Sequence, residues 1–103
     1  MTEPFTHSRP DHYTETEVAD SIISSYLMRI RMELERALRK HPRPLKSLHE
    51  GHSVIREEFE EFWDEVKAQN LTAHSVELEL VQTAAMCLRV LVELGPFGFK
   101  AQP

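Results

Sequence analysis

The sequence predicts an all-α protein whose three main helices form an oligomeric bundle, either a dimer or a tetramer. Three long segments repeat apolar residues at the 3.6-residue period of a helix, and no segment alternates convincingly with the period of two that marks a strand. The 103 residues suffice for one domain with a single core. We expect this domain at residues 14–95, between a polar, flexible N-terminus at 1–13 and a C-terminal tail at 96–103.

The first helix is predicted at residues 15–40. Thr14 and Glu17 have the spacing of a capping box, in which two side chains satisfy free amide groups of the first turn. Pro42 and Pro44 end the helix, because proline has no amide hydrogen to donate and clashes with the preceding turn. Six apolar side chains between these signals share one face at helical spacing: Ile23, Tyr26, Leu27, Ile30, Leu34 and Leu38.

The second helix is predicted at residues 48–68, where Ser47 and Glu50 offer another capping box. Gly51 would weaken an exposed helix interior by roughly 1 kcal/mol relative to alanine. We therefore expect a close packing contact, or a place in the first turns, to account for this glycine. At about 100° per residue, four apolar side chains form a stripe along this helix: Ile55, Phe59, Phe62 and Val66.

The third helix is predicted at residues 73–94 and ends at Gly95 and Pro96. Its second half, residues 80–94, has only four polar side chains, so it is apolar on nearly every side. A helix of this kind is buried on most sides, and two other helices from one chain cannot surround it. We therefore expect a second copy of the chain to complete the cover, most simply in a symmetric homodimer. Cys87 lies in this apolar run, which predicts a buried, inert thiol.

Composition and charge argue against several classes of function. The 17 acidic and 12 basic residues give a net charge of −5, which argues against a nucleic-acid partner. Seven of the basic residues lie between Arg29 and Lys46, and seven acidic residues lie between positions 50 and 65. The N-terminus lacks the apolar region of a signal peptide, and no uncharged apolar run reaches the length of a membrane span. We therefore expect a cytoplasmic protein without a membrane partner.

Residues 56–65 hold the most informative pattern, with six carboxylates and three aromatic rings. Helical phase places Glu58, Glu61 and Glu65 on one flank of the apolar stripe, within an arc of about 60°. Carboxylates crowded at the edge of a buried face repel one another, and a hard divalent cation relieves that repulsion. The alternative is an ordinary solvated helix surface, on which acids pair with basic residues one turn away.

Glu79 and Gln82 lie at i and i+3 on one face of the third helix, which continues inward. A buried carboxylate at position 79 needs a partner, because an unpaired buried charge is expensive. A cation shared with the acids of the second helix would supply one, and a salt bridge from Arg29 or Arg31 is the alternative. Because every candidate ligand is an oxygen atom, the cation would be Mg²⁺ or Mn²⁺.

The two motifs together resemble those of the MazG-like all-α nucleoside triphosphate pyrophosphohydrolases. Residues 57–61 read EEFEE and fit the EExxE motif, and residues 79–82 read ELVQ where that family has ExxD. The resemblance covers roughly residues 20–94 and points to a small, divergent subgroup. It implies an oligomeric helical enzyme that uses Mg²⁺ to hydrolyse a nucleoside or deoxynucleoside triphosphate to the monophosphate and pyrophosphate, a house-cleaning reaction.

The resemblance assigns the metal to four side chains: Glu58, Glu61, Glu79 and Gln82. It makes Glu57 and Glu65 the candidate catalytic residues, either as secondary metal ligands or as groups that position the attacking water. From the basic part of the chain, Lys46 and Arg31 are the candidate contacts to the substrate phosphates.

Gln82 departs from the family motif, which has aspartate at this position. An amide oxygen can coordinate a hard cation, but it adds no negative charge and binds more weakly. Two other interpretations therefore stay open. One is a catalytically weakened relative that binds nucleotides or serves as a helical interaction module. The other is a homodimeric bundle whose acids form a solvated face.

Overall fold

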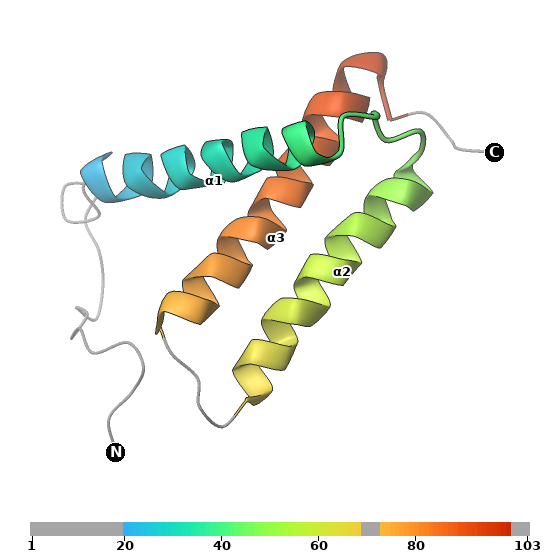
Figure 1. Ribbon diagram of the computed structural model, residues 1–103. Helices are drawn as coiled ribbons and strands as arrows, with labels where there is room; N and C mark the ends of the chain where they lie inside the picture. The colour runs from blue at the N-terminus through green and yellow to red at the C-terminus, as the bar shows by residue number, and fades with distance from the viewer. Residues whose placement is uncertain (1–19, 69–72, 100–103) are drawn as a thin grey trace.

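The computed structural model describes residues 20–68 and 73–99, which form three α-helices (Figure 1). Helix α1 is Asp20–Lys40, α2 is Leu48–Lys67 and α3 is Ala73–Leu94, and the short 3₁₀ helix η1, Gly95–Phe97, follows α3 directly. These described residues contain no strand, so the predicted all-α class with three main helices is confirmed. The predicted start of the first helix, with its capping box at Thr14, lies outside the described residues, as does the predicted N-terminus.

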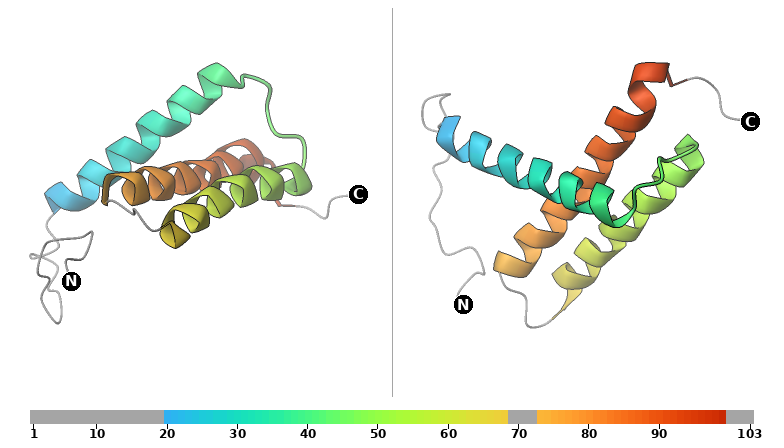
Figure 2. Two further views of the ribbon diagram at one scale, coloured as in Figure 1. Left: turned by 60° about the horizontal axis from the view of Figure 1, so that its bottom comes forward. Right: turned by 45° about the horizontal axis from the view of Figure 1, so that its top comes forward.

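Helices α2 and α3 lie side by side and run in opposite directions, whereas α1 crosses α3 obliquely (Figure 1, Figure 2). Helix α1 thus forms a second layer on the α2–α3 pair. Helix α3 is central, with backbone contacts to both α1 and α2. The connection at residues 41–47 leads from the end of α1 to the start of α2, and these two helices make no direct backbone contact.

The core lies where the second half of α1 crosses α3. Leu34 and Ala37 of α1 are buried there, and so are Ala85 and Met86 of α3. Helix α2 adds two partly buried side chains: Val54 and Ile55. Burial of a leucine or methionine side chain contributes roughly 1.5–3 kcal/mol. This crossing therefore holds the three helices together and fixes the side chains beside it.

The connection between α1 and α2 ends in the predicted capping box. Ser47 Oγ accepts a hydrogen bond from the amide of Glu50 at 3.1 Å. The carboxylate of Glu50 accepts a hydrogen bond from the amide of Lys46 at 2.8 Å, one residue before the N-cap. The Ser47 cap is thus confirmed, whereas the return bond of the predicted box goes to Lys46 and not to Ser47 itself. The two bonds fix the start of α2.

Gly51 allows α2 and α3 to approach closely. A β-carbon at this position would lie 2.8 Å from Cγ2 of Val90, whose buried, β-branched side chain has little freedom to rotate away. We expect Gly51→Ala to lower the free energy of unfolding by about 1–3 kcal/mol through overpacking, although alanine is favoured in helices by roughly 1 kcal/mol. Urea denaturation measures this change.

The matching variant is Val90→Ala, which removes the methyl group that the new β-carbon would meet. The double variant should therefore be less destabilised than the sum of the two single variants. A Gly51→Ala protein as stable as the wild type would contradict the close contact.

The predicted apolar stripe of α2 is only partly covered. Ile55 and Phe62 are partly buried, but 54% of Phe59 is exposed and Val66 is exposed as well. A different line of buried and partly buried positions runs along the helix: Gly51, Ile55, Glu58, Phe62 and Glu65. Helix α2 is therefore rotated relative to the prediction, which brings Glu58 and Glu65 to its covered side and leaves Glu61 exposed.

One chain leaves apolar side chains of α3 uncovered, because α1 and α2 pack against only part of this helix. Leu80, Leu91 and Val92 are exposed. Cys87 is exposed too, so the prediction of a buried thiol is wrong for the single chain. A second exposed apolar group lies on α1: Ile22, Ile23, Tyr26, Leu27, Met28 and Met32. None of the described helices combines the length and the apolar character that crossing a lipid bilayer requires.

Candidate metal centre

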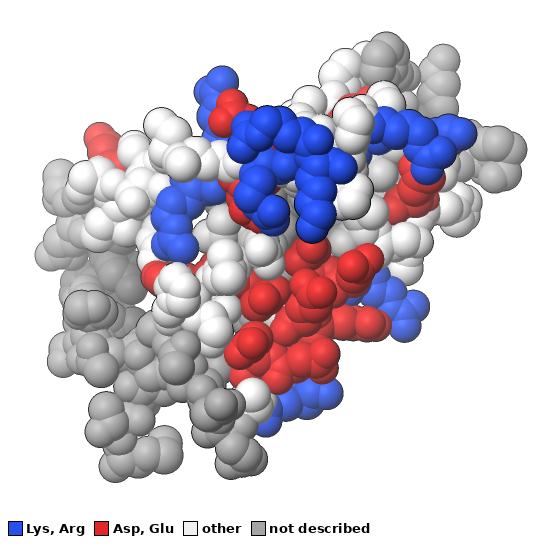
Figure 3. Space-filling model, in the orientation of Figure 1, with Lys and Arg blue, Asp and Glu red and all other residues white. Residues whose placement is uncertain are grey.

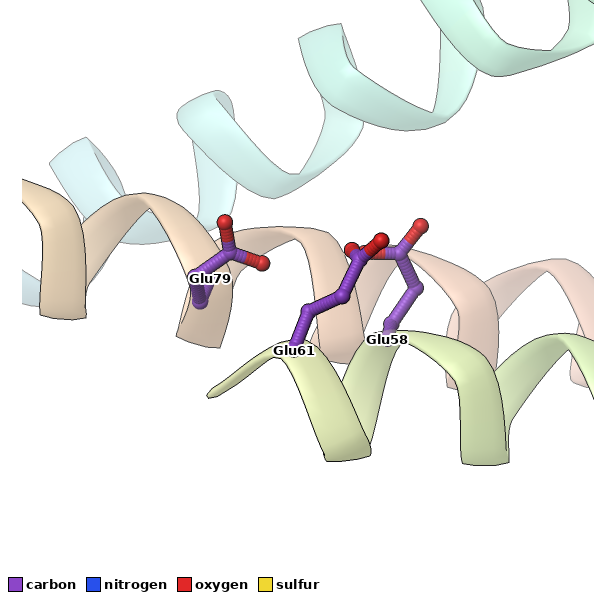
Figure 4. A group of neighbouring side chains, drawn as sticks. All are labelled: Glu58, Glu61 and Glu79. Carbon is purple, nitrogen blue, oxygen red and sulfur yellow. The ribbon is translucent and has the colours of Figure 1, made fainter. Parts of the chain in front are cut away.

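Three glutamates from two helices converge, and we call them the glutamate trio: Glu58, Glu61 and Glu79. Glu58 and Glu61 lie one turn apart on α2, and Glu79 lies near the start of α3. Each offers one carboxylate oxygen, and these three oxygens lie within 4.8 Å of one another. Figure 4 shows the three side chains directed into the same space, on the side where α1 crosses. The structure thus brings together three of the four metal ligands expected from the sequence.

Two oxygens of the trio are buried without a hydrogen-bond partner. They are Oε2 of Glu58 and Oε2 of Glu79. A buried carboxylate oxygen that lacks a partner costs about 1–3 kcal/mol, and more when it carries charge. Either a proton or a cation would relieve this cost, and a divalent cation would do so for all three carboxylates together.

The electrostatic consequence is a raised pKa at two of the three glutamates. The pKa of the Glu58 carboxyl is raised to about 7. Burial is the largest cause, followed by the hydrogen bond and charge of Glu61 and by the charge of Glu79. Burial also raises the pKa of Glu79, with help from the negative charges of Glu61 and Glu65. Below about pH 7, therefore, the Glu58 carboxyl holds a proton, and a cation bound there would displace it.

Gln82, the fourth expected ligand, lies one turn after Glu79 and is not one of the three converging side chains. It lines a cavity beside the site together with Glu33 of α1. The same Glu33 carboxylate accepts hydrogen bonds from Arg36, with Nη2 at 2.6 Å from Oε1 and Nε at 3.0 Å from Oε2. These bonds from Arg36 are the largest reason that the pKa of Glu33 lies below its usual value. Glu33 thus faces the cavity from α1 with Arg36 as its partner.

Sequence reasoning missed Glu33. The signal available was its position, because it precedes Leu34 and lies four residues before Ala37, both of which are buried against α3. An acid next to the buried face of an amphipathic helix needs a partner. Its partner on α1, Arg36, follows at i+3, but the place of Glu33 beside the cavity depends on how α1 and α3 cross.

A cavity of about 760 Å³ opens beside the trio and has walls of opposite charge. The acidic wall comes from α2 and includes Glu57 along with two members of the trio. The opposite wall comes from the end of α1 and the following connection, and we call its three cations the cationic wall: Arg36, Lys40 and Arg43. Figure 3 shows the acidic area over α2 directly below the basic area over the end of α1. Such a pairing of charges suits an anionic ligand together with a cation.

The cations predicted to bind phosphate do not line this cavity. The side chain of Arg31 is 74% exposed and pairs with Glu35 at 3.5 Å on the outer side of α1. Lys46 is exposed and is likewise absent from the residues that line the cavity. The cationic wall occupies the place that the sequence analysis gave to these two residues. The difference arises because the orientation of α1 is set by its crossing with α3.

The two predicted catalytic residues occupy different positions. Glu57 is exposed and lines the cavity next to Glu58. Glu65 does not line the cavity, but its charge acts on Glu79. The alternative salt bridge to Glu79 is not formed within the described residues, since Arg29 pairs with Glu77 at 3.7 Å instead.

A buried ion pair fastens the connection that carries the cationic wall. Arg89 Nε donates to Glu93 Oε2 at 2.9 Å, and its Nη2 donates to the backbone carbonyls of His41 and Arg43 at 3.1 and 3.0 Å. Glu93 Oε1 in turn accepts a hydrogen bond from the amide of Leu45 at 2.6 Å. The two side chains are only 5% and 12% exposed. They tie the connection to α3 and thereby hold Arg43 beside the cavity.

Comparisons with protein-family models, with curated proteins and with solved structures find no match to this chain.

Proposed function

We propose that the protein is a hydrolase that uses Mg²⁺ or Mn²⁺ to convert a nucleoside triphosphate to the monophosphate and pyrophosphate. One observation carries the proposal: the glutamate trio, with two buried oxygens that lack a partner, lies beside a cavity whose other wall is cationic. The donor set is made of oxygen atoms alone, which fits a hard divalent cation. The cavity also falls within the range of volumes typical of small-molecule sites.

Each wall has a distinct part in the proposed reaction. A water oxygen bonds to phosphorus, the anhydride bond between the α- and β-phosphates breaks, and pyrophosphate leaves. The glutamate trio would hold the divalent cation, which neutralises phosphate charge when it is bound. The cationic wall binds the phosphate oxygens and sets the polyphosphate chain along the cavity. Glu57, at the solvent side, orients the water and accepts its proton.

The direct test incubates the protein with a panel of ribo- and deoxyribonucleoside triphosphates and Mg²⁺ or Mn²⁺, and measures pyrophosphate and monophosphate. The expected result is metal-dependent release of both products in equal amounts. Release of inorganic phosphate with the diphosphate would indicate cleavage at another bond. Absence of products, together with absence of saturable metal binding, would overturn the proposal.

The neutral side chain of Gln82 favours a second candidate function, which is nucleotide binding without turnover. A cation held by three carboxylates and an amide is bound less tightly than one held by four carboxylates. Calorimetry with a nucleoside triphosphate and Mg²⁺ separates the two functions. Saturable binding without pyrophosphate release would support the binding module, whereas turnover would support the enzyme.

We also propose that two copies of the chain associate through the exposed apolar residues of α1 and α3. A single chain leaves these large apolar side chains uncovered on two helices, which is unusual for a stable monomer. We expect the 12.0 kDa chain to sediment at twice its mass or a higher multiple. Charge at Leu27, which is 61% exposed, should disrupt the contact, so Leu27→Glu is expected to sediment as a monomer.

The control for this variant is Arg39→Glu, which introduces the same side chain at an exposed polar position of the same helix. It should sediment like the wild type. A wild-type protein that sediments as a monomer across the micromolar range would overturn the proposed association.

A further inference from the structure

The ion pair of Glu33 and Arg36 is closer and better shielded than its neighbour on the same helix. Arg36 Nη2 lies 2.6 Å from Glu33 Oε1, and Arg36 Nε lies 3.0 Å from Oε2 and 3.2 Å from Oε1, so both carboxylate oxygens are engaged. In the pair of Arg31 and Glu35, the distance from Nε to Oε2 is 3.5 Å. The side chain of Glu33 is 14% exposed, against 51% for Glu35. Arg36 therefore replaces hydration that Glu33 has lost.

This pair faces the glutamate trio across one cavity. Glu33 and Arg36 line the cavity from α1, and Glu58 and Glu61 line it from α2. Figure 4 shows the carboxylates of the trio directed toward the side where α1 crosses. The hydrogen bond to Glu33 is the largest cause of the raised pKa of Arg36, and the charge of Glu58 adds to it. Arg36 thus places a positive charge within electrostatic reach of the trio.

An arginine in this position competes with a metal ion for the same carboxylates. The Arg36 side chain is 52% exposed, so it has room to rotate. If it turned onto the trio, its guanidinium would donate to the oxygens of Glu58 and Glu79 that lack a partner. A divalent cation would then have to displace the arginine, and its apparent affinity would fall. The bonds to Glu33 engage Nε and Nη2 of Arg36 and so hold the guanidinium on α1.

We infer that Glu33 is a positioning residue of the proposed metal centre, where it holds Arg36 away from the glutamate trio and so keeps the trio open to a divalent cation. The inference rests on the proposed function, because it assigns a role at that site. Glu33 thereby keeps the two walls of the cavity from neutralising each other. The trio remains free for the cation, and Arg36 remains part of the cationic wall.

The test is a double-mutant cycle on Mn²⁺ affinity, measured by calorimetry in the full-length protein without nucleotide. In the wild-type background, Glu33→Gln should weaken Mn²⁺ binding by about 10–100-fold, the usual range for loss of a partner outside the ligand set. In the Arg36→Gln background the same substitution should change the affinity by less than about 3-fold, because no arginine remains to enter the trio. Thermal unfolding checks that every variant is folded.

Two single variants serve as controls. Glu35→Gln makes the same change of charge on the same helix, at an exposed side chain that pairs with Arg31. It should bind Mn²⁺ like the wild type. Arg36→Gln alone should bind Mn²⁺ at least as tightly as the wild type, because it removes the competing cation.

The outcomes separate this inference from the proposed function. Wild-type protein that binds no Mn²⁺ would overturn both. Wild-type binding with an affinity that Glu33→Gln leaves unchanged would overturn only the role of Glu33. Equal losses from Glu33→Gln in the two backgrounds would also overturn only that role, because the charge of Glu33 itself would then account for the loss.

Discussion

Replacement of Glu58 by glutamine is expected to abolish saturable Mn²⁺ binding and to lower pyrophosphate release by more than about 100-fold, since loss of an outer partner of a ligand alone costs 10–100-fold. Glu58 has one buried oxygen that lacks a hydrogen-bond partner, and its carboxyl interacts with Glu61. Its charge is therefore the one in the trio that most needs a cation. Glutamine has nearly the same shape, so the substitution removes charge without opening a cavity. Calorimetry and the product assay measure the two losses.

The same substitution should stabilise the metal-free protein, and the effect should depend on pH. The pKa of Glu58 is about 7 in the folded protein against 4.5 for a free side chain. Between these values the folded state binds the proton more tightly than the unfolded state, so the free energy of unfolding falls as pH rises from about 4.5 to 7. Glu58→Gln removes this loss. After allowance for solvent screening, the variant should be more stable than the wild type by on the order of 1 kcal/mol at pH 8 and equally stable at pH 4.

The control is Glu60→Gln on the same helix. Glu60 is exposed and pairs with Arg56 at 2.8 Å, so its substitution makes the same change of charge away from the site. We expect unchanged Mn²⁺ binding and a change in stability within about 0.5 kcal/mol. Identical metal titrations in the Glu58 and Glu60 variants would mean that the acids of α2 form a solvated face.

Local signals in the sequence predicted the helices well. Ser47 and Glu50 predicted the start of α2, and Gly95 with Pro96 predicted the end of α3, because caps and breakers act within a few residues. The pairing of Glu58 and Glu61 with Glu79 was also predicted, since each set lies on one face of its helix and adjacent helices in a short chain are neighbours.

Contacts that depend on the crossing of α1 and α3 were not predictable in this way. The phase of α2 was misjudged because Phe59 is more hydrophobic than Glu58, and hydrophobicity alone places phenylalanine inside. Yet the structure buries part of Glu58 and exposes Phe59. Glu33 and Gln82 line the same cavity although they are 49 positions apart, and nothing in the spacing of either motif encodes this proximity. The hydrogen bonds of Arg89 were not predicted either, because two of its acceptors are backbone carbonyls, which no side-chain pattern reveals.

Arg89→Met is expected to lower the free energy of unfolding by about 3–5 kcal/mol, the usual cost of removing one partner from a buried ion pair. The substitution leaves the Glu93 carboxylate buried without its cation and leaves the carbonyls of His41 and Arg43 without a donor. Denaturation in urea measures the loss. Because the connection carries part of the cationic wall, affinity for a nucleoside triphosphate should fall as well.

The chain contains its own control for burial, because Arg56 and Glu60 form a pair with the same spacing and nearly the same length. The distance from Arg56 Nε to Glu60 Oε1 is 2.8 Å, against 2.9 Å from Arg89 Nε to Glu93 Oε2, but the Arg56 side chain is 66% exposed. Arg56→Met should therefore cost no more than about 1 kcal/mol. Equal losses in the two arginine variants would contradict the role of burial.

A double variant, Arg89→Met with Glu93→Met, measures what the buried ion pair contributes to the free energy of unfolding. An ion pair that served only to neutralise its own charges would be replaced by two apolar side chains with little loss, or with a gain of about 1–4 kcal/mol. We expect most of the loss to persist, because the amide of Leu45 and two carbonyls of the connection would still lack their partners. Recovery of wild-type stability and of nucleotide affinity would mean that the connection holds its place without the pair.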